Sequence, residues 1–373
     1  MPAMHLPRGA RTIHRRAACR GRAALLAALS LAGCAAPLQP WNTATTPQMR
    51  VPAIQHQGQD RRARFREILC AVLAADRDGV PDYRPCDDAL TRLGDEPAAS
   101  GAPVRLGPAR RPLKAVFVPG LGWDCFAQWL NAQDSIPAHL RAIGYDMQTL
   151  AIEGLAGSAH NARRIRDLII AMPHAATTPD LVLIGYSKGA VDTLEALAEY
   201  PELRPRIAAV VSVAGAVGGS PLANTMREAQ LDLMRYFPGA TCRNYPDGAL
   251  ADLRPDARQA WLASHALVPG VRYYSLITYP EPARISGLLQ GSYRKLARVD
   301  ARNDSQLIFY DQFIPGSALM AYLNADHWAV ALPIARGHAL AGATLIEQNA
   351  YPREALYESV LRLIEEDLLL DTE

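Results

Sequence analysis

The chain has 373 residues, enough for one large domain or two ordinary ones. With 49% hydrophobic and 20% charged residues, its composition is that of a soluble globular protein with a sizeable core. The 39 basic residues nearly balance the 37 acidic ones, and the arginine excess gathers at the extreme N-terminus, so nucleic-acid binding is not indicated.

The first 33 residues are predicted to be a signal peptide. A basic stretch, 8–22, precedes a short apolar one, 23–31, which is too short to span a bilayer comfortably. Next, Leu31-Ala32-Gly33-Cys34 resembles the lipobox of bacterial lipoproteins, in which the Cys becomes the lipidated first residue. The resemblance implies a lipid anchor at Cys34, on the periplasmic side of the outer membrane of the cell envelope. An ordinary secretory peptide cleaved near residue 35 or 36 is the alternative.

Residues 34–59 are rich in Pro, Gln and Thr, and we interpret them as a flexible tether. Apolar residues then recur at helical spacing, which predicts a helical extension over 60–100, ahead of a domain over 101–373. Export implies an oxidising compartment, where cysteines pair. Excluding Cys19 and Cys34, four remain, and we predict the pairs Cys70–Cys86 and Cys125–Cys242, with four free thiols as the alternative.

From residue 112, β-rich runs alternate with amphipathic stretches, which is typical of a mostly parallel sheet flanked by helices. The segment 220–269 interrupts this rhythm. Apolar residues at helical spacing there (Met226, Leu233, Met234 and Phe237) favour a cap over the sheet edge, and added core packing is the alternative. The predicted strands are 115–118, 145–151, 181–186, 207–214 and 271–278, and the predicted helices are 127–143, 159–171, 188–200 and 354–369.

The strand 181–186 runs directly into Gly185-Tyr186-Ser187-Lys188-Gly189, a G-x-S-x-G motif followed by a helix. Small flanking residues let the backbones approach closely at a strained turn, and the helix N-terminus favours developing negative charge. The motif resembles the nucleophile turn of the α/β-hydrolase family of lipases and esterases, and the resemblance extends over about 112–328. It implies an α/β-hydrolase fold with Ser187 as the nucleophile.

Val116-Phe117-Val118-Pro119-Gly120-Leu121-Gly122 resembles the family's strand and H-G-x segment, with Pro119 in place of the His. By this resemblance the backbone N–H groups of Leu121 and Lys188 form the oxyanion hole. A glycine-rich turn without a catalytic part is the alternative.

The family's chain order places the acid and then the His after the nucleophile, which leaves His265, His327 and His338. His265 falls within the interrupting segment and His338 beyond the last strand-like run. His327, in Asp326-His327-Trp328, is therefore the predicted general base and acid.

The acid is chosen among Asp300, Asp304 and Asp311. Asn303-Asp304-Ser305 resembles the family's N-D-G turn with Ser in place of Gly, which favours Asp304, with Asp311 as the next choice. Its role is to orient the imidazole of His327 and to stabilise its charged form.

No spacing in the sequence indicates a nucleotide loop or a metal site, so no cofactor or metal is expected. The resulting hypothesis is an envelope-anchored serine hydrolase that cleaves small-molecule or lipid esters through an acyl-enzyme. An acyltransferase on the same triad and a noncatalytic lipoprotein that keeps the fold are the alternatives. Acyl and alcohol specificity and oligomeric state stay open.

Overall fold

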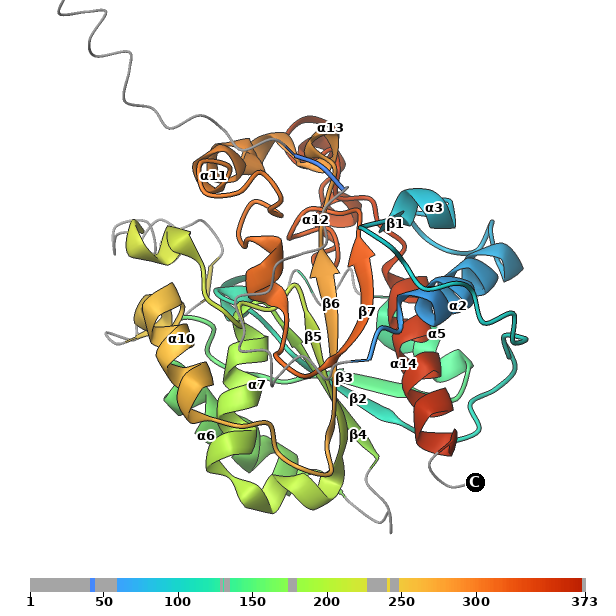
Figure 1. Ribbon diagram of the computed structural model, residues 1–373, viewed down its shortest axis with the longest axis horizontal. Helices are drawn as coiled ribbons and strands as arrows, with labels where there is room; N and C mark the ends of the chain where they lie inside the picture. The colour runs from blue at the N-terminus through green and yellow to red at the C-terminus, as the bar shows by residue number, and fades with distance from the viewer. Residues whose placement is uncertain are drawn as a thin grey trace, which may run out of the picture. The chain divides into compact units, whose positions relative to one another are not determined.

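The longest apolar runs of the sequence form the middle of a seven-stranded sheet in the computed structural model (Figure 1). β4 (Leu181–Tyr186) and β5 (Ile207–Val213) are buried along their whole length, as strands covered on both faces must be. The strand order is β1-β7-β6-β5-β4-β2-β3, and all pairs are parallel except β1 with β7. The other strands are β1 (Leu90–Thr91), β2 (Lys114–Val118), β3 (Asp146–Thr149), β6 (Arg272–Thr278) and β7 (Ala318–Leu323).

The structure describes residues 41–43, 59–127, 130, 135–173, 180–226, 240–241 and 248–370. All of them lie within 39–373, which forms one unit. The predicted signal peptide, Cys34 and most of the predicted tether fall outside the described residues. Within the described part, no helix combines the length and apolar character needed to cross a bilayer.

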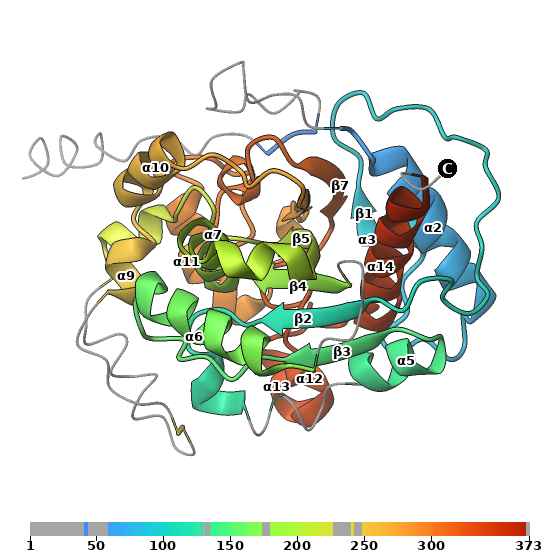
Figure 2. The same cartoon turned by 90° about the horizontal axis from the view of Figure 1, so that it is seen from below.

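Helices cover both faces of the sheet (Figure 2). Alternate residues of each strand point to opposite faces, so one set packs against α6 (Ser158–Ala171) and α7 (Lys188–Glu199), and the other against a second group of helices. That second group comprises α2 (Arg62–Ala75), α5 (Ile136–Ala142) and α14 (Arg353–Leu370). The short helices are α3 (Cys86–Ala89), α9 (Ala249–Asp252), α10 (Pro255–Ser264), α11 (Gln290–Leu296), α12 (Ile334–Gly337) and α13 (Ala339–Thr344).

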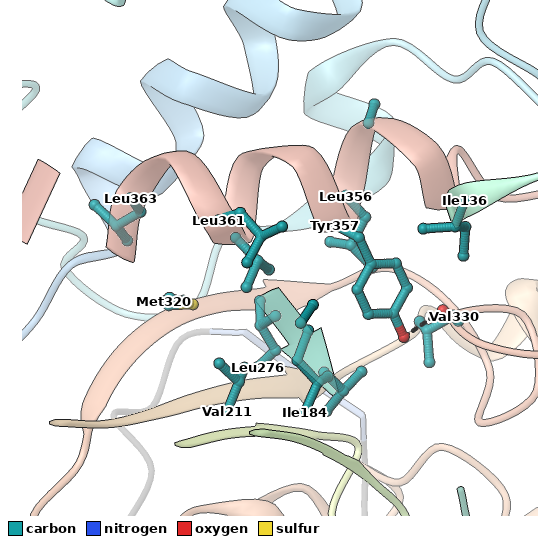
Figure 3. Close-up of a cluster of buried hydrophobic side chains, with 14 of the residues drawn as sticks. Ile136, Ile184, Val211, Leu276, Met320, Val330, Leu356, Tyr357, Leu361 and Leu363 are labelled. Atoms are coloured by element: carbon teal, nitrogen blue, oxygen red, sulfur yellow. Dashed lines mark hydrogen bonds between the residues drawn. The ribbon is translucent and has the colours of Figure 1, made fainter. Parts of the chain in front are cut away.

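The core under α14 shows how this packing is built (Figure 3). Leu356 and Leu361 of α14 point toward Ile184, Val211 and Leu276 of the three central strands, and all five side chains are buried. Burying one such aliphatic side chain stabilises the fold by about 1.5–3 kcal/mol. This close packing holds the strands, and the loops at their ends, in fixed positions.

The predicted fold class is confirmed, and the five predicted strands are present with ends within two residues of those expected. Three predicted helices, 159–171, 188–200 and 354–369, are likewise present as α6, α7 and α14. Of the predicted helix 127–143, the structure describes α5 and the helical residues 127 and 130, whereas residues 128–129 and 131–134 lie outside the described residues.

The segment 60–100, predicted as a helical extension, contains the helices α2 and α3 and lies in the same unit as residues 101–373. Its helix α2 packs against α14 and β7. Its strand β1 adds to the sheet, where Leu90 pairs with Leu323 of β7. A two-residue strand leaves too little sequence pattern to be recognised without its partner.

One predicted disulfide is present. Cys70 of α2 is bonded to Cys86, the first residue of α3, with Cα atoms 5.1 Å apart, so the bond ties two helices of the 60–100 segment together. Cys125 is also disulfide-bonded. Its predicted partner, Cys242, lies outside the described residues.

The segment 220–269 has two structural roles. Trp261 and Leu262 of α10 pack against the core on the α7 side of the sheet. Leu222 and Leu253 line a cavity next to Ser187 instead. Of the four residues that favoured a cap, Met226 lines this cavity, whereas Leu233, Met234 and Phe237 lie outside the described residues.

Candidate active site

Ser187 lies in a sharp turn between β4 and α7. Its backbone has φ 54° and ψ −122°, a conformation that a non-glycine residue adopts only under strain. Neighbouring glycines make the turn possible: a Cβ at Gly185 would lie 2.5 Å from Cα of Ala190, and one at Gly189 would lie 2.0 Å from the carbonyl oxygen of Val118. The G-x-S-x-G spacing is therefore required by close packing, and it leaves the half-buried serine at the carboxyl end of the sheet.

His327 reaches Ser187 from the loop that follows β7. Its Nε2 atom lies 2.9 Å from Oγ of Ser187. The loop is fixed on both sides: Tyr186 donates its hydroxyl hydrogen bond to the carbonyl oxygen of His327 at 2.9 Å, and the Asp326 carboxylate accepts from the N–H of Ala329 at 3.0 Å. The imidazole is 4% exposed and so has little freedom to rotate away.

Two residues next to His327 in space, Tyr186 and Asp326, have shifted pKa values. Burial raises the pKa of Tyr186 well above its ordinary value, so its hydroxyl stays a neutral donor. Burial also raises the pKa of Asp326, although hydrogen bonds from Ser286 and Ala329 act to lower it. The Asp326 carboxylate accepts from the N–H of Ser286 at 3.0 Å, which attaches the His327 loop to the segment after β6.

Asp304 stands on the far side of His327. Its Oδ2 atom lies 2.8 Å from Nδ1 of His327. Its Oδ1 atom accepts from the N–H groups of Gln306 and Leu307, at 2.9 and 2.7 Å. Thr278 donates a further hydrogen bond to Oδ2. The carboxylate is completely buried, and these donors stabilise it there.

The other two candidate acids are placed elsewhere. Asp300 forms an ion pair with Arg302, at 2.6 Å. The carbonyl oxygen of Asp311 accepts from the N–H of Gly218 at 2.7 Å, which ties it to the loop after β5. Of the three aspartates, Asp304 is the one whose carboxylate hydrogen-bonds to His327.

The two predicted oxyanion donors, the N–H groups of Leu121 and Lys188, belong to residues close to Ser187. Gly120 packs so tightly that a Cβ there would lie 2.8 Å from Cβ of Ser187, which places Leu121 at the wall of the same cavity. Lys188 is the first residue of α7, where an N–H has no acceptor within the helix. Neither the Leu121 nor the Lys188 N–H donates to a backbone acceptor in the described part of the chain.

The cavity in front of Ser187 has a volume of about 280 Å³. One wall comes from the loop after β2 and the loop after β7, with Trp123, Phe126 and Ile334. A further part of the lining comes from the segment 220–269, with Leu222 and Leu253. No Asp, Glu, Lys or Arg is among the described residues that line it, so the cavity suits an uncharged, apolar ligand.

Comparisons with known proteins agree with this geometry. No protein-family model and no curated protein matches the chain. Among solved structures, a metagenomic carboxyl esterase, MGS0156, is 39% identical and aligns over 87% of this chain and 97% of its own, with a TM-score of 0.78. The chain belongs to the α/β-hydrolase superfamily of carboxyl esterases and lipases.

Two solved lipase structures are similar to the chain at lower identity. Mature lipase BlEst2 from Bacillus licheniformis is 19% identical, over 62% of this chain and 91% of its own, with a TM-score of 0.47. Lipase 1 from Pelosinus fermentans is 12% identical, over 70% of this chain and 98% of its own, with a TM-score of 0.48. The family assignment rests on the carboxyl esterase alone.

The two departures from the family pattern leave this arrangement intact. Ser305, where the family has Gly, adopts φ 84°, the left-handed conformation that a glycine would provide. Pro119, where the family has His, precedes the backbone groups of Gly120 and Leu121 and removes neither of their N–H groups. Both substitutions are therefore compatible with an α/β-hydrolase site.

Sequence reasoning missed a buried network behind the nucleophile turn. The side chain of Lys188 is completely buried, with Nζ 2.7 and 2.8 Å from the two carboxylate oxygens of Asp192. Asn161 of α6 donates to the same carboxylate at 2.7 Å. The i,i+4 spacing of Lys188 and Asp192 was a usable signal, but such pairs are common on exposed helix faces.

Among the described residues, no group of three or more His, Cys, Asp or Glu side chains is placed to hold a metal ion.

Proposed function

We propose that this chain hydrolyses carboxylic esters by acyl transfer to Ser187. The observation that carries the proposal is the continuous hydrogen-bond chain from Oγ of Ser187 to His327, at 2.9 Å, and from His327 to Asp304, at 2.8 Å, next to an apolar cavity. A nucleophile, a base and a group that orients the base, in that order, are what an activated serine requires.

The proposed reaction has two halves. In the first, Oγ of Ser187 attacks the ester carbonyl while its proton moves to Nε2 of His327, and the same proton then goes to the leaving alkoxide, which departs as the alcohol. In the second, water gives a proton to His327 and attacks the acyl-enzyme, and the serine recovers its proton as the acid leaves. Asp304 stays ionised and stabilises the imidazolium throughout.

The proposed oxyanion donors are the N–H groups of Leu121 and Lys188. They have no backbone acceptor among the described residues; Lys188 follows Ser187 directly, and Leu121 lines the same cavity as Ser187. Donors fixed in place before the reaction stabilise the tetrahedral oxyanion without reorganising, and removing one such donor costs about 10²–10³ in kcat.

The decisive experiment compares the parent with Ser187→Ala on short p-nitrophenyl esters. Ser264→Ala is a matched control, because Ser264 lies at the exposed end of α10. We expect Ser187→Ala to abolish turnover with an unchanged circular dichroism spectrum, and Ser264→Ala to behave as the parent. Full activity in Ser187→Ala would overturn the proposal.

A fluorophosphonate probe separates an active hydrolase from a noncatalytic member of the fold. We expect labelling of the parent and none of Ser187→Ala or His327→Gln, because the reaction needs an activated serine. An unlabelled parent that is correctly folded would favour the noncatalytic alternative. Adding a primary alcohol to the ester assay then distinguishes hydrolysis from acyl transfer, through the ratio of acid to new ester.

We also propose that Cys34 anchors the chain to the cell envelope. The proposal rests on the sequence, where a basic and an apolar stretch precede Leu31-Ala32-Gly33-Cys34. Several acyl chains on one cysteine would hold a protein at a membrane far better than one. Cys34→Ser is expected to move the protein from the detergent phase to the aqueous phase, and unchanged partitioning would refute the anchor.

A further inference from the structure

Two surface segments lie beyond the carboxyl ends of β6 and β7, on the side of the sheet that carries Ser187 (Figure 1). We call them together the rim surface: residues 287–299, which include α11, and residues 334–345, which include α12 and α13. A hydrogen bond of 2.8 Å from the N–H of Leu288 to the carbonyl oxygen of Leu345 joins the two segments. They therefore form one continuous surface.

The rim surface is continuous with the cavity. Ile334, at the start of α12, is itself a lining residue. On the other segment, α11 packs against the 3₁₀ helix Pro221–Asn224, which contributes Leu222 to the cavity wall. A flat partner bound to the rim surface would thus lie at the edge of the cavity.

Large apolar side chains are exposed on this surface. Four of the six large hydrophobic residues that are exposed in the described part of the chain belong to it. Their exposed fractions are 55% for Leu288, 50% for Val299, 80% for Leu340 and 50% for Leu345. Single exposed apolar residues need no explanation, but a group beside a binding cavity indicates an interaction site.

The charged side chains within the two segments of the rim surface are all basic. Arg294, Lys295 and Arg298 are exposed, and none of them makes an ion pair with any described residue. No Asp or Glu occurs in 285–299 or in 333–346. Of the acids that come next in the chain, Asp300 forms an ion pair with Arg302, and the exposed Glu347 accepts a hydrogen bond from the N–H of Gly287 at 3.0 Å and is one negative charge at the edge of three exposed cations.

We propose that the rim surface docks this chain on a bilayer that contains anionic phospholipid, with the cavity beside the lipid. Exposed leucines insert at the boundary between headgroups and acyl chains, and nearby cations are attracted by the negative surface potential. A second copy of the chain fits less well, because pairing two rim surfaces would bring cations together with too few acids to neutralise them. The docking does not depend on the proposed ester hydrolysis.

The test measures co-sedimentation of residues 39–373, which form one unit and lack both Cys34 and the basic and apolar stretches of 8–31, with phosphatidylcholine vesicles with and without phosphatidylglycerol. We expect binding to the anionic vesicles that weakens with added salt, and little binding to phosphatidylcholine alone. Equal binding to both kinds of vesicle, or to neither, would overturn the proposal.

Two variants in the same background locate the binding surface. Arg294→Gln/Lys295→Gln is expected to weaken binding to anionic vesicles by roughly tenfold or more, since each cation near such a surface contributes measurably. Leu288→Ser/Leu340→Ser is expected to weaken it as well, through lost insertion. The matched control is Arg163→Gln/Ile170→Ser on α6, which removes an exposed cation and a 51%-exposed isoleucine elsewhere.

The control variant should bind as the parent does, and a loss equal to that of the rim variants would refute the assignment. Turnover of a soluble p-nitrophenyl ester should be unchanged in both rim variants, because none of the four residues lines the cavity. This readout keeps the two proposals distinguishable: if Ser187→Ala retains activity, the hydrolase proposal fails while the vesicle result still decides the docking.

Discussion

The carboxylate of Asp304 and the imidazole of His327 are joined by a hydrogen bond of 2.8 Å, although 23 residues separate them in the chain. The N–H of His327 also donates to the carbonyl oxygen of Asp304, at 3.0 Å. The loops after β6 and β7 are thus connected twice at this point, through side chains and through backbone, which fixes the orientation of the ring toward Ser187.

Replacing Asp304 by Asn is expected to lower kcat about a thousandfold or more, because the amide stabilises the wrong imidazole tautomer and cannot balance its charge. Steady-state kinetics on a short ester measures this. Asp311→Asn is the matched control, since Asp311 was the next choice from the sequence and its backbone carbonyl accepts from the N–H of Gly218. A larger loss of kcat in Asp311→Asn than in Asp304→Asn would reverse the assignment of the acid.

The buried pair of Lys188 and Asp192 should be sensitive to the loss of one partner. Asp192→Leu leaves the Lys188 ammonium buried without its counterion, and we expect the free energy of unfolding to fall by about 3–5 kcal/mol. The double variant Lys188→Met/Asp192→Leu should lose much less, because no uncompensated charge remains. Urea denaturation of the three proteins tests this, and equal stability of the single and double variants would contradict it.

Ser305→Gly is expected to raise the free energy of unfolding by about 1 kcal/mol, since φ 84° is strained for serine but not for glycine. The substitution also removes a buried hydroxyl for which the described residues offer no hydrogen-bond partner. Ser317→Gly provides the comparison: that buried hydroxyl bonds to Ser275 at 2.8 Å, so its loss should destabilise. A lower urea midpoint for Ser305→Gly would count against the argument.

The pair of His139 on α5 and Glu358 on α14, with Nε2 and Oε2 2.6 Å apart, should make stability depend on pH. The hydrogen bond to Glu358 raises the pKa of His139 above its ordinary 6.5, despite the opposing effect of burial. A raised histidine pKa stabilises the fold below the unfolded value, and this contribution is lost as pH rises through the folded value.

We therefore expect His139→Gln to be less stable than the parent at pH 5.5 and to approach it above pH 8, in urea denaturation curves at each pH. The contribution of Glu358 to stability has the opposite pH dependence: it is present above the unfolded pKa of the carboxyl group and is lost as pH falls. Burial acts to raise the pKa of Glu358, but hydrogen bonds from His139 and Arg362 lower it below 4.5, so its contribution is lost only in stronger acid. A stability difference that grows from pH 5.5 to pH 8 would contradict this account.

Local patterns in the sequence were sufficient for five of the seven strands, for α6, α7 and α14, and for the sharp turn at Ser187. Short apolar runs that alternate with amphipathic stretches indicate buried strands, and the turn requires glycines at fixed offsets, so both leave a signature within a few consecutive residues. His327 was predicted from the order of the catalytic residues in the family that the sequence resembles. The pair Cys70–Cys86 followed from an even cysteine count and a short loop between them.

Tertiary structure alone decided features that depend on residues distant in the chain. The resemblance to the family's N-D-G turn favoured Asp304 over Asp300 and Asp311, but only the return of the loop after β7 brings its carboxylate to Nδ1 of His327. The strand β1 exists because β7 offers an edge to pair with. Lys188 illustrates both levels: its place after Ser187 predicts the role of its backbone, whereas the burial of its side chain against Asp192 is set by the packing of α6 and α7 around it.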